Sequence, residues 1–331
     1  MTTYVLGAGA SHHAGYPLCK ELWPRMTTWV SESPAAQSSY ERVINRVRGL
    51  LNDPVDDMEA VLTDLTLKRG VFGELSDSDG KAMLDGIREC FRGFFKDIHS
   101  KKKRGGARLY RDFAGKVEPG DVIVTFNYDV ALENELFPAG RFRVRGGYGR
   151  AMALEWPEGK SSVVVLKLHG SINWNGRIGS QGAFVLGKHL SPFVDNVDGL
   201  LVDYPKSVLD KEFKASNVVG QSITLILPSY RKRYSVRTSI GPEFVAFYKS
   251  LWAEAAEKLR GANRIVIIGY RMPAADREPR KLLFCSTKRD AEVIICCGSS
   301  NADVKKQFED RGFSRVSEAG TFENFLRAPP K

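Results

Sequence analysis

Cys-x-x-Cys pairs and long apolar runs are both missing from this sequence of 331 residues. Its five cysteines form no Cys-x-x-Cys pair, which argues against a structural zinc site or a disulfide framework and favours reduced thiols. No apolar stretch reaches the about 20 residues that a helix needs to cross a bilayer. The start, Met1–Leu6, has neither the basic nor the apolar region of a secretory signal. We therefore expect a cytoplasmic protein that does not associate with membranes.

Acidic residues are outnumbered by basic ones, which gives a formal net charge of +10. Two basic runs stand out, Lys101–Arg104 and Arg231–Arg233. A nucleic acid could bind such a surface, but the chain lacks the aromatic residues interleaved with basic ones that known nucleic-acid modules carry. We interpret the runs as solvated loops and do not predict a nucleic-acid partner, which stays an alternative.

Apolar runs of the kind found in buried parallel strands recur along the chain. They are Thr3–Leu6, Asp121–Phe126, Val163–Leu168, Ile223–Leu227, Ile265–Ile268 and Val293–Ile295. Helices are predicted between or after them, at Val130–Phe137, Pro242–Leu259, Arg280–Phe284 and Ala302–Arg311. Alternating strands and helices predict an α/β fold, a Rossmann-type parallel sheet with helices on both faces.

The predicted sheet is interrupted twice within what we expect to be one domain, residues 1–331. Apolar residues recur at helical spacing from about residue 38 to residue 113, which predicts a helical insertion over residues 26–117. Residues 176–217 are rich in glycine and polar residues and predict a less regular insertion. The Rossmann core would then comprise residues 1–25, 118–175 and 218–331.

A glycine turn, Gly7-Ala8-Gly9-Ala10-Ser11, directly follows the first predicted strand. Glycine lets backbone amides approach a pyrophosphate with no Cβ in the way, as a dinucleotide site requires. The dehydrogenase fingerprint G-x-G-x-x-G fails because its last position is His12. Taken alone, the turn is a weak signal that fits either a nucleotide site or a plain strand–helix connection.

Further sequence blocks, most of them at the ends of predicted strands, favour the nucleotide site. The turn continues into Gly15-Tyr16-Pro17, and strand ends carry Thr125–Asp129, Leu168–Ser171 and Gly269-Tyr270. This set resembles the sirtuin family, whose opening reads G-A-G-x-S-x-x-x-G-x-P and whose later blocks are T-x-N-x-D, the catalytic-histidine block and G-x-S.

A divergent sirtuin-like branch of bacterial anti-phage systems is more similar still. It tends to read L-H-G-S-x-x-W, as Leu168–Trp174 does here, and G-Y-S-x-P-x-x-D, which Gly269–Asp276 follows with Arg271 in place of the serine. A helical insertion before the T-x-N-x-D block is also usual in that branch.

The resemblance implies that NAD is the substrate and that Asn127 and His169 are catalytic. We expect no metal, because no carboxylate or cysteine near His12-His13 completes a metal site. The residues that the resemblance implies for binding NAD are Gly7, Ala8, Gly9, Ser11, Pro17, Asp129, Gly170, Gly269 and Arg271. From chemistry alone, an imidazole can act as a general base, and an amide can orient water or a ribose hydroxyl. Asp129 as a helix cap, Asn127 as a turn residue and His169 as a core residue are the structural alternatives.

The reaction expected from these residues is cleavage of the nicotinamide–ribose bond by water, an NAD glycohydrolase activity. Sirtuin deacylases carry a zinc ribbon that this chain lacks, and Phe126 stands where they have glutamine. An NAD-dependent deacylase or ADP-ribosyltransferase and a non-catalytic nucleotide or nucleic-acid binding module are the alternatives. The resemblance further implies anti-phage abortive infection by NAD depletion, a homo-oligomer, and an activating partner such as a multimeric ATPase.

Overall fold

The computed structural model describes residues 1–51, 58–101, 107–150, 161–179, 218–223, 225–228, 242–274 and 276–328. The basic run Arg231–Arg233 and all but the first residue of Lys101–Arg104 lie outside these ranges. Within them, no helix is long and apolar enough to cross a membrane.

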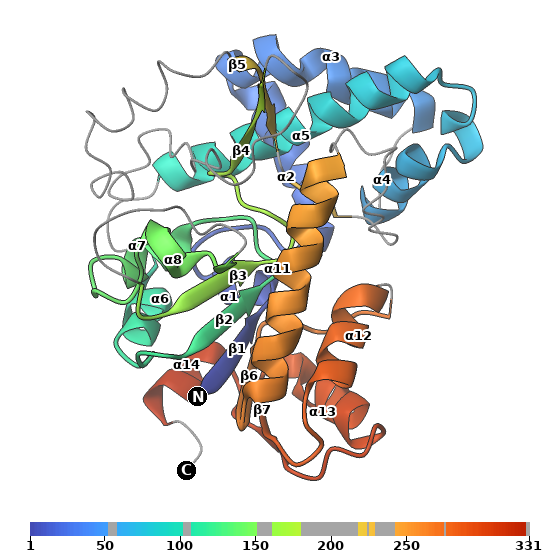
Figure 1. The fold of residues 1–331 in the computed structure, drawn as a ribbon. Coiled ribbons are helices and arrows are strands. Elements are labelled where there is room, and N and C mark those ends of the chain that lie inside the picture. The colour runs from blue at the N-terminus through green and yellow to red at the C-terminus, as the bar shows by residue number, and fades with distance from the viewer. Residues whose placement is uncertain are drawn as a thin grey trace.

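A six-stranded parallel sheet forms the centre of the molecule (Figure 1). Its strands are β1 (Thr2–Leu6), β2 (Val122–Thr125), β3 (Val164–Lys167), β6 (Arg264–Ile268), β7 (Glu292–Cys296) and β8 (Val316–Glu318). They lie in the order β3-β2-β1-β6-β7-β8, and nearly every residue of the first five is buried. The prediction of a Rossmann-type parallel sheet is confirmed.

The register of the sheet aligns the strand ends. Leu6 lies opposite Thr125 on one side and Ile268 on the other. The residues that follow these strands, Gly7, Phe126 and Gly269, therefore line one edge. Strand order reverses between β1 and β6, and in open parallel sheets ligands bind beyond the carboxyl ends of the strands at such a reversal.

Helices cover both faces of this sheet (Figure 1). They are α1 (Ala8–His12), α6 (Arg108–Ala114), α7 (Ala131–Leu136), α8 (Val144–Gly147), α11 (Pro242–Gly261), α12 (Arg277–Ser286), α13 (Asn301–Glu309) and α14 (Phe322–Arg327). On one face, Phe113 of α6 packs edge-on against Tyr4 of β1 at 4.9 Å and against Phe322 of α14 at 5.6 Å. The long helix α11 crosses the other face.

A helical module lies beyond the carboxyl ends of the strands, at the top of Figure 1. It consists of α2 (Cys19–Glu32), α3 (Pro34–Leu51), α4 (Met58–Leu67), the short 3-10 helix η1 (Gly70–Phe72) and α5 (Asp77–Ser100). Ser76 caps α5 by accepting a hydrogen bond from the Asp79 amide at 3.0 Å, and Asp77 and Asp79 lie in its first turn. The helical character expected for residues 26–117 is thus present. Its helices begin earlier, at Cys19, and α6 packs against α7 and α14 rather than with the module.

One predicted strand is wrong. Ile223–Leu227 is not a strand of the parallel sheet: Ile223 ends β5 (Val218–Ile223), which pairs antiparallel with β4 (Asn175–Gly179). Leu225–Pro228 continues without strand structure, as a buried extension. An apolar run shows that a segment is buried, but it does not show which partner it meets. Residues 180–217 of the predicted irregular insertion lie outside the described residues.

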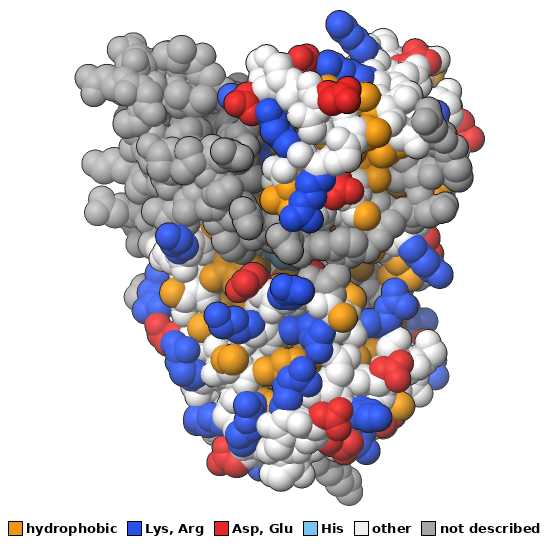
Figure 2. Space-filling view, turned by 90° about the vertical axis from the view of Figure 1, so that its right-hand side faces the viewer, with side chains coloured by type: hydrophobic (Ala, Val, Ile, Leu, Met, Phe, Trp, Pro, Cys, Tyr) orange, Lys and Arg blue, Asp and Glu red, His pale blue; other side chains and the backbone are white. Residues whose placement is uncertain are grey.

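Charged side chains on the face shown in Figure 2 are spread over the surface. Lysine and arginine occupy much of its lower half and are interleaved with acidic and uncharged side chains. Among the described residues, the only large hydrophobic side chains that are exposed are Met1 and Val71.

Candidate active site

A cavity of about 340 Å³ opens where the strand order reverses. It is lined from the ends of β1, β2, β3, β6 and β7 and closed by residues of the helical module. The predicted site residues that line it are Gly7, Ala8, Gly9, Ser11, Pro17, Asn127, Asp129, His169, Gly269 and Arg271. Gly170 is the predicted residue that does not line it; its amide donates to the Lys167 carbonyl in a turn with φ +86°.

The glycine turn is packed tightly against the end of β6. The Gly7 amide donates to the Ile268 carbonyl and the Gly9 amide to the Gly269 carbonyl, each at 3.0 Å. A Cβ on Gly9 would lie 2.9 Å from the Gly269 Cα, and one on Gly269 would lie 2.2 Å from the Ala10 nitrogen. The amides of Gly7 and Gly9 are thus used inside the protein. What these glycines supply is space for the two turns to meet.

Asn127 is held by its amide nitrogen. Nδ2 donates to the Gly7 carbonyl and to Ser11 Oγ, both at 2.9 Å, and the backbone amide donates to Thr125 Oγ1 at 3.0 Å. Because the Gly7 carbonyl can only accept, the side-chain atom facing it must be the nitrogen. Both N–H groups of the amide are therefore occupied, and Oδ1 remains to accept a hydrogen bond from a ligand.

Ser11 connects Asn127 to the last helix before β2. Ser11 Oγ lies 2.7 Å from the hydroxyl of Tyr110 in α6, and both side chains are fully buried. Burial, and after it the nearby Asp129 carboxylate, raises the pKa of Tyr110 well above its usual value. Tyr110 therefore stays a neutral hydroxyl that can hold Ser11 in place.

Asp129 bonds to the first residue of α7, although Val130 is the N-cap, and it also lines the cavity. Its Oδ1 accepts a hydrogen bond from the Ala131 amide at 3.1 Å at the start of α7. The residue is 4% exposed and lies on the cavity wall. The second carboxylate oxygen is the atom through which it could accept from a carboxamide ligand.

His169 lies in an aromatic environment. It is 3% exposed, and its ring centroid is 5.2 Å from Phe126, 5.9 Å from Tyr128 and 6.4 Å from Trp252. Its backbone carbonyl accepts from the Ile226 amide at 3.0 Å. Aromatic faces lower the local polarity, which strengthens a hydrogen bond made there. They also favour a positive charge placed over them.

The turn after β6 forms another wall. Gly269 (φ +60°) and Met272 (φ +54°) both adopt left-handed backbone, which for methionine is an uncommon conformation. Tyr270 donates its hydroxyl to Asp276 at 2.9 Å, and Arg271 is exposed at the cavity. An arginine here could bind a phosphate oxygen through two parallel hydrogen bonds.

Several cavity residues were not among the predicted ones. The module contributes Leu22, Glu59, Phe91 and Phe95, the segment before it contributes Tyr16, and the end of β7 contributes Cys297, Ser299 and Ser300. The rule that ligands bind at carboxyl strand ends could have found the last three. The module residues carry no such signal, because their helical spacing is that of ordinary core packing.

Cys297 is a cavity thiol of low reactivity. Burial raises its pKa to about 11, so it is protonated at neutral pH. Among the described residues, no group of three or more His, Cys, Asp or Glu side chains could hold a metal ion.

Comparison with known proteins yields only distant similarity. No protein-family model and no curated protein matches the chain. A solved Sir2 homologue–NAD complex is 14% identical, with a TM-score of 0.40, over 98% of this chain and 86% of that chain. A Sir2 structure with the inhibitor EX-527, 2'-O-acetyl-ADP-ribose and deacetylated p53 peptide is 13% identical, with a TM-score of 0.36, over 99% and 91%. Values this low carry no conclusion about the chemistry of this chain.

Proposed function

We propose that this chain is an NAD glycohydrolase that releases nicotinamide and ADP-ribose. The observation that carries the proposal is the convergence of Asn127, His169 and the packed glycine turn on one cavity at the strand-order reversal. These residues come from the ends of β1, β2 and β3, far apart in the sequence. The same residues form the sequence blocks that resemble the sirtuin family.

The chemistry of each side chain fits this reaction. Nicotinamide leaves NAD as a neutral group, and positive charge develops on the ribose as it does in glycoside hydrolysis. Asn127 Oδ1, an acceptor because Nδ2 is occupied, would hold a ribose hydroxyl or the attacking water. His169 would act as general base toward the same hydroxyl or water, and the aromatic faces of Phe126 and Tyr128 would stabilise the developing cation.

The remaining contacts divide between the two ends of NAD. Asp129 would accept from the nicotinamide carboxamide. The pyrophosphate would lie against the wall that the Gly7–Gly9 turn forms with Ala8, Ser11, Pro17 and Gly269. Arg271 would pair with a phosphate oxygen.

Water is the proposed acceptor of the ribosyl group, because the chain has no Cys-x-x-Cys pair from which a peptide-binding zinc ribbon could be built. In the cell, we propose a cytoplasmic effector of anti-phage abortive infection that acts by NAD depletion. Such an activity needs restraint, for which a homo-oligomer or a multimeric ATPase partner is the proposed device.

The test is nicotinamide release from NAD by the full chain, with and without an acylated peptide. We expect release without peptide, and Asn127→Ala and His169→Ala to lower its rate by at least about 100-fold, the usual effect of losing an acid–base or orienting group. Asn324→Ala, an exposed asparagine in α14, is the matched control and should leave the rate unchanged. Equal rates in all variants would reject the site. Release that requires the peptide would replace the hydrolase by a deacylase or ADP-ribosyltransferase.

A further inference from the structure

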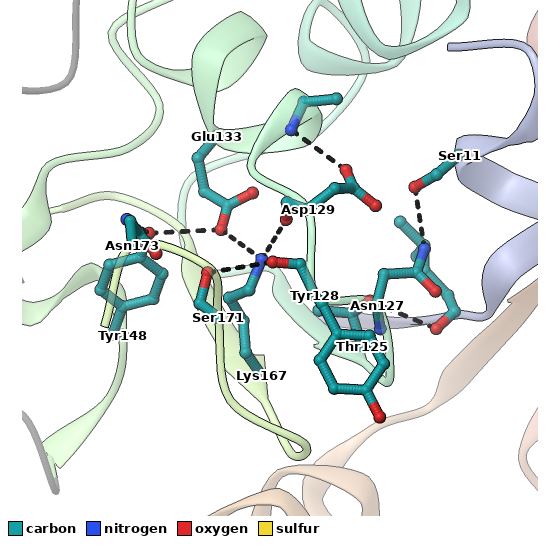
Figure 3. Close-up of polar contacts among 12 residues, drawn as sticks. Ser11, Thr125, Asn127, Tyr128, Asp129, Glu133, Tyr148, Lys167, Ser171 and Asn173 are labelled. Carbon is teal, nitrogen blue, oxygen red and sulfur yellow. Dashed lines mark hydrogen bonds and ion pairs between the residues drawn. The ribbon is translucent and has the colours of Figure 1, made fainter. Parts of the chain in front are cut away.

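A buried ion pair lies directly behind the cavity wall (Figure 3). Lys167, the last residue of β3, places Nζ 2.8 Å from Glu133 Oε1 of α7, and each residue is 1% exposed. Taking two charges out of water is costly, and a buried pair often adds no stability over apolar residues of the same volume. A role beyond stability would explain a pair at this position.

Lys167 makes a second contact that points to such a role. Its ammonium also donates to the backbone carbonyl of Asp129. One cation at the end of β3 is thus bonded both to α7 and to the loop that joins β2 to α7. This loop carries Asn127 and Asp129 on its cavity side.

The preceding carbonyl of the same loop is held from the same side, by the segment that follows β3. The Tyr128 carbonyl accepts from the Ile172 amide at 3.0 Å and from Ser171 Oγ at 3.3 Å. Consecutive carbonyls of the loop are therefore fixed by β3 and the segment after it, as Figure 3 shows. A loop with two adjacent carbonyls held in this way has little freedom to rotate its side chains out of the cavity.

Glu133 is fixed in turn by neutral partners. Its Oε1 also accepts from the Tyr148 hydroxyl at 3.2 Å, and that hydroxyl accepts from Asn173 Nδ2 at 3.1 Å. Burial raises the pKa of Glu133, and Lys167 opposes this by favouring the carboxylate. These contacts keep the ammonium aimed at the loop.

We infer that Lys167 is a positioning residue that, through the Asp129 carbonyl, holds Asn127 and Asp129 in the orientation required at the cavity. The inference rests on the proposed function for its kinetic consequence only. The clamp itself is a property of the loop and can be measured without NAD.

The test removes both charges together, because Lys167→Met alone would leave Glu133 buried without its cation. In the double variant Lys167→Met, Glu133→Leu, the Asp129 carbonyl and the Tyr148 hydroxyl lose these partners, so we expect a melting temperature modestly below that of the wild type. Amide hydrogen exchange at Asn127–Ala131 should become at least about tenfold faster. For NAD cleavage, kcat should fall by about 100-fold and more than KM rises, as expected when a reacting group is displaced by about 1 Å.

The matched control is Arg264→Met with Glu292→Leu. It removes an ion pair of 2.6 Å at the amino ends of β6 and β7, away from the cavity. It should change neither the loop exchange nor kcat. Wild-type kcat in the Lys167 double variant would overturn the inference, as would loop exchange that stays at the wild-type rate. If the wild type does not cleave NAD, the proposed function fails, and the exchange rates still decide whether the clamp exists.

Discussion

Polar groups at the two ends of the central sheet differ in how they are hydrogen-bonded. At the amino ends, Asp121 accepts backbone hydrogen bonds from Thr2 at 2.8 Å and from Glu118 at 3.1 Å, and Arg264 pairs with Glu292 near the surface. These contacts join polar groups of the protein to one another. At the carboxyl ends, buried polar side chains lie along a cavity and keep atoms available for a ligand, as Asn127 does with Oδ1.

This difference separates polar groups that stabilise the fold from polar groups that could take part in a reaction. A buried polar group is costly unless it is bonded, so a sheet has no structural reason to gather such groups at one edge. At the edge where the strand order reverses, Thr125, Asn127, Asp129, His169 and Ser171 are all buried. We therefore expect substitutions there to change chemistry more than stability, and substitutions at the amino edge to do the reverse.

The largest contrast should come from two glycines with positive φ, Gly269 (+60°) and Gly120 (+91°). A Cβ on Gly269 would lie 2.2 Å from the Ala10 nitrogen, whereas one on Gly120 would meet nothing within 4 Å. Gly269→Ala should push the glycine turn out of place, which adds about 1–3 kcal/mol of overpacking. We expect it to lower kcat/KM for NAD by at least about 100-fold, since a displacement near 1 Å has that effect.

Gly120→Ala is the control for the backbone conformation. It should lose about 1–2 kcal/mol of stability, the cost of left-handed backbone, and keep full activity. Urea unfolding and nicotinamide release measure the two quantities. Full activity in Gly269→Ala would mean that the packing of the turn does not matter to the reaction.

A smaller contrast is expected from two buried tyrosines, Tyr110 behind the cavity and Tyr4 in β1. Tyr110→Phe removes the hydroxyl 2.7 Å from Ser11 Oγ, which in turn accepts from Asn127. We expect a stability loss of about 1 kcal/mol, the usual worth of one hydrogen bond, and a rate of NAD cleavage about tenfold lower. Tyr4→Phe, a change of a strand residue that does not line the cavity, should leave the rate unchanged. Equal rates for both variants would remove Ser11 from the account.

Much of the sheet was predictable from sequence because buried parallel strands are short, β-branched and continuous. Val122–Thr125 and Arg264–Ile268 are of this kind. β8 was missed because its residues, Val316–Glu318, are half-buried or exposed and give no apolar run. Ile223–Leu227 was misplaced because burial beneath Tyr128, whose hydroxyl donates to the Ile226 carbonyl at 2.7 Å, produces the same pattern as a strand.

The candidate site was predictable to the extent that it lies on strand ends. Asn127 and His169 follow β2 and β3, and the parallel register brings such residues to one edge. Residues supplied by the helical module, such as Phe91 and Phe95, could not be predicted because their position depends on how α5 packs beyond the carboxyl ends of the strands. The bond between Lys167 and the Asp129 carbonyl was equally hidden, since a sequence does not show which backbone group a lysine meets.

The most direct measurement is a crystal structure of the His169→Ala variant grown with saturating NAD. We predict that the uncleaved dinucleotide fills the cavity, with its pyrophosphate against Gly7–Gly9 and its nicotinamide ribose within hydrogen-bond distance of Asn127 Oδ1. A cavity that stays empty, or NAD bound elsewhere on the molecule, would contradict the account.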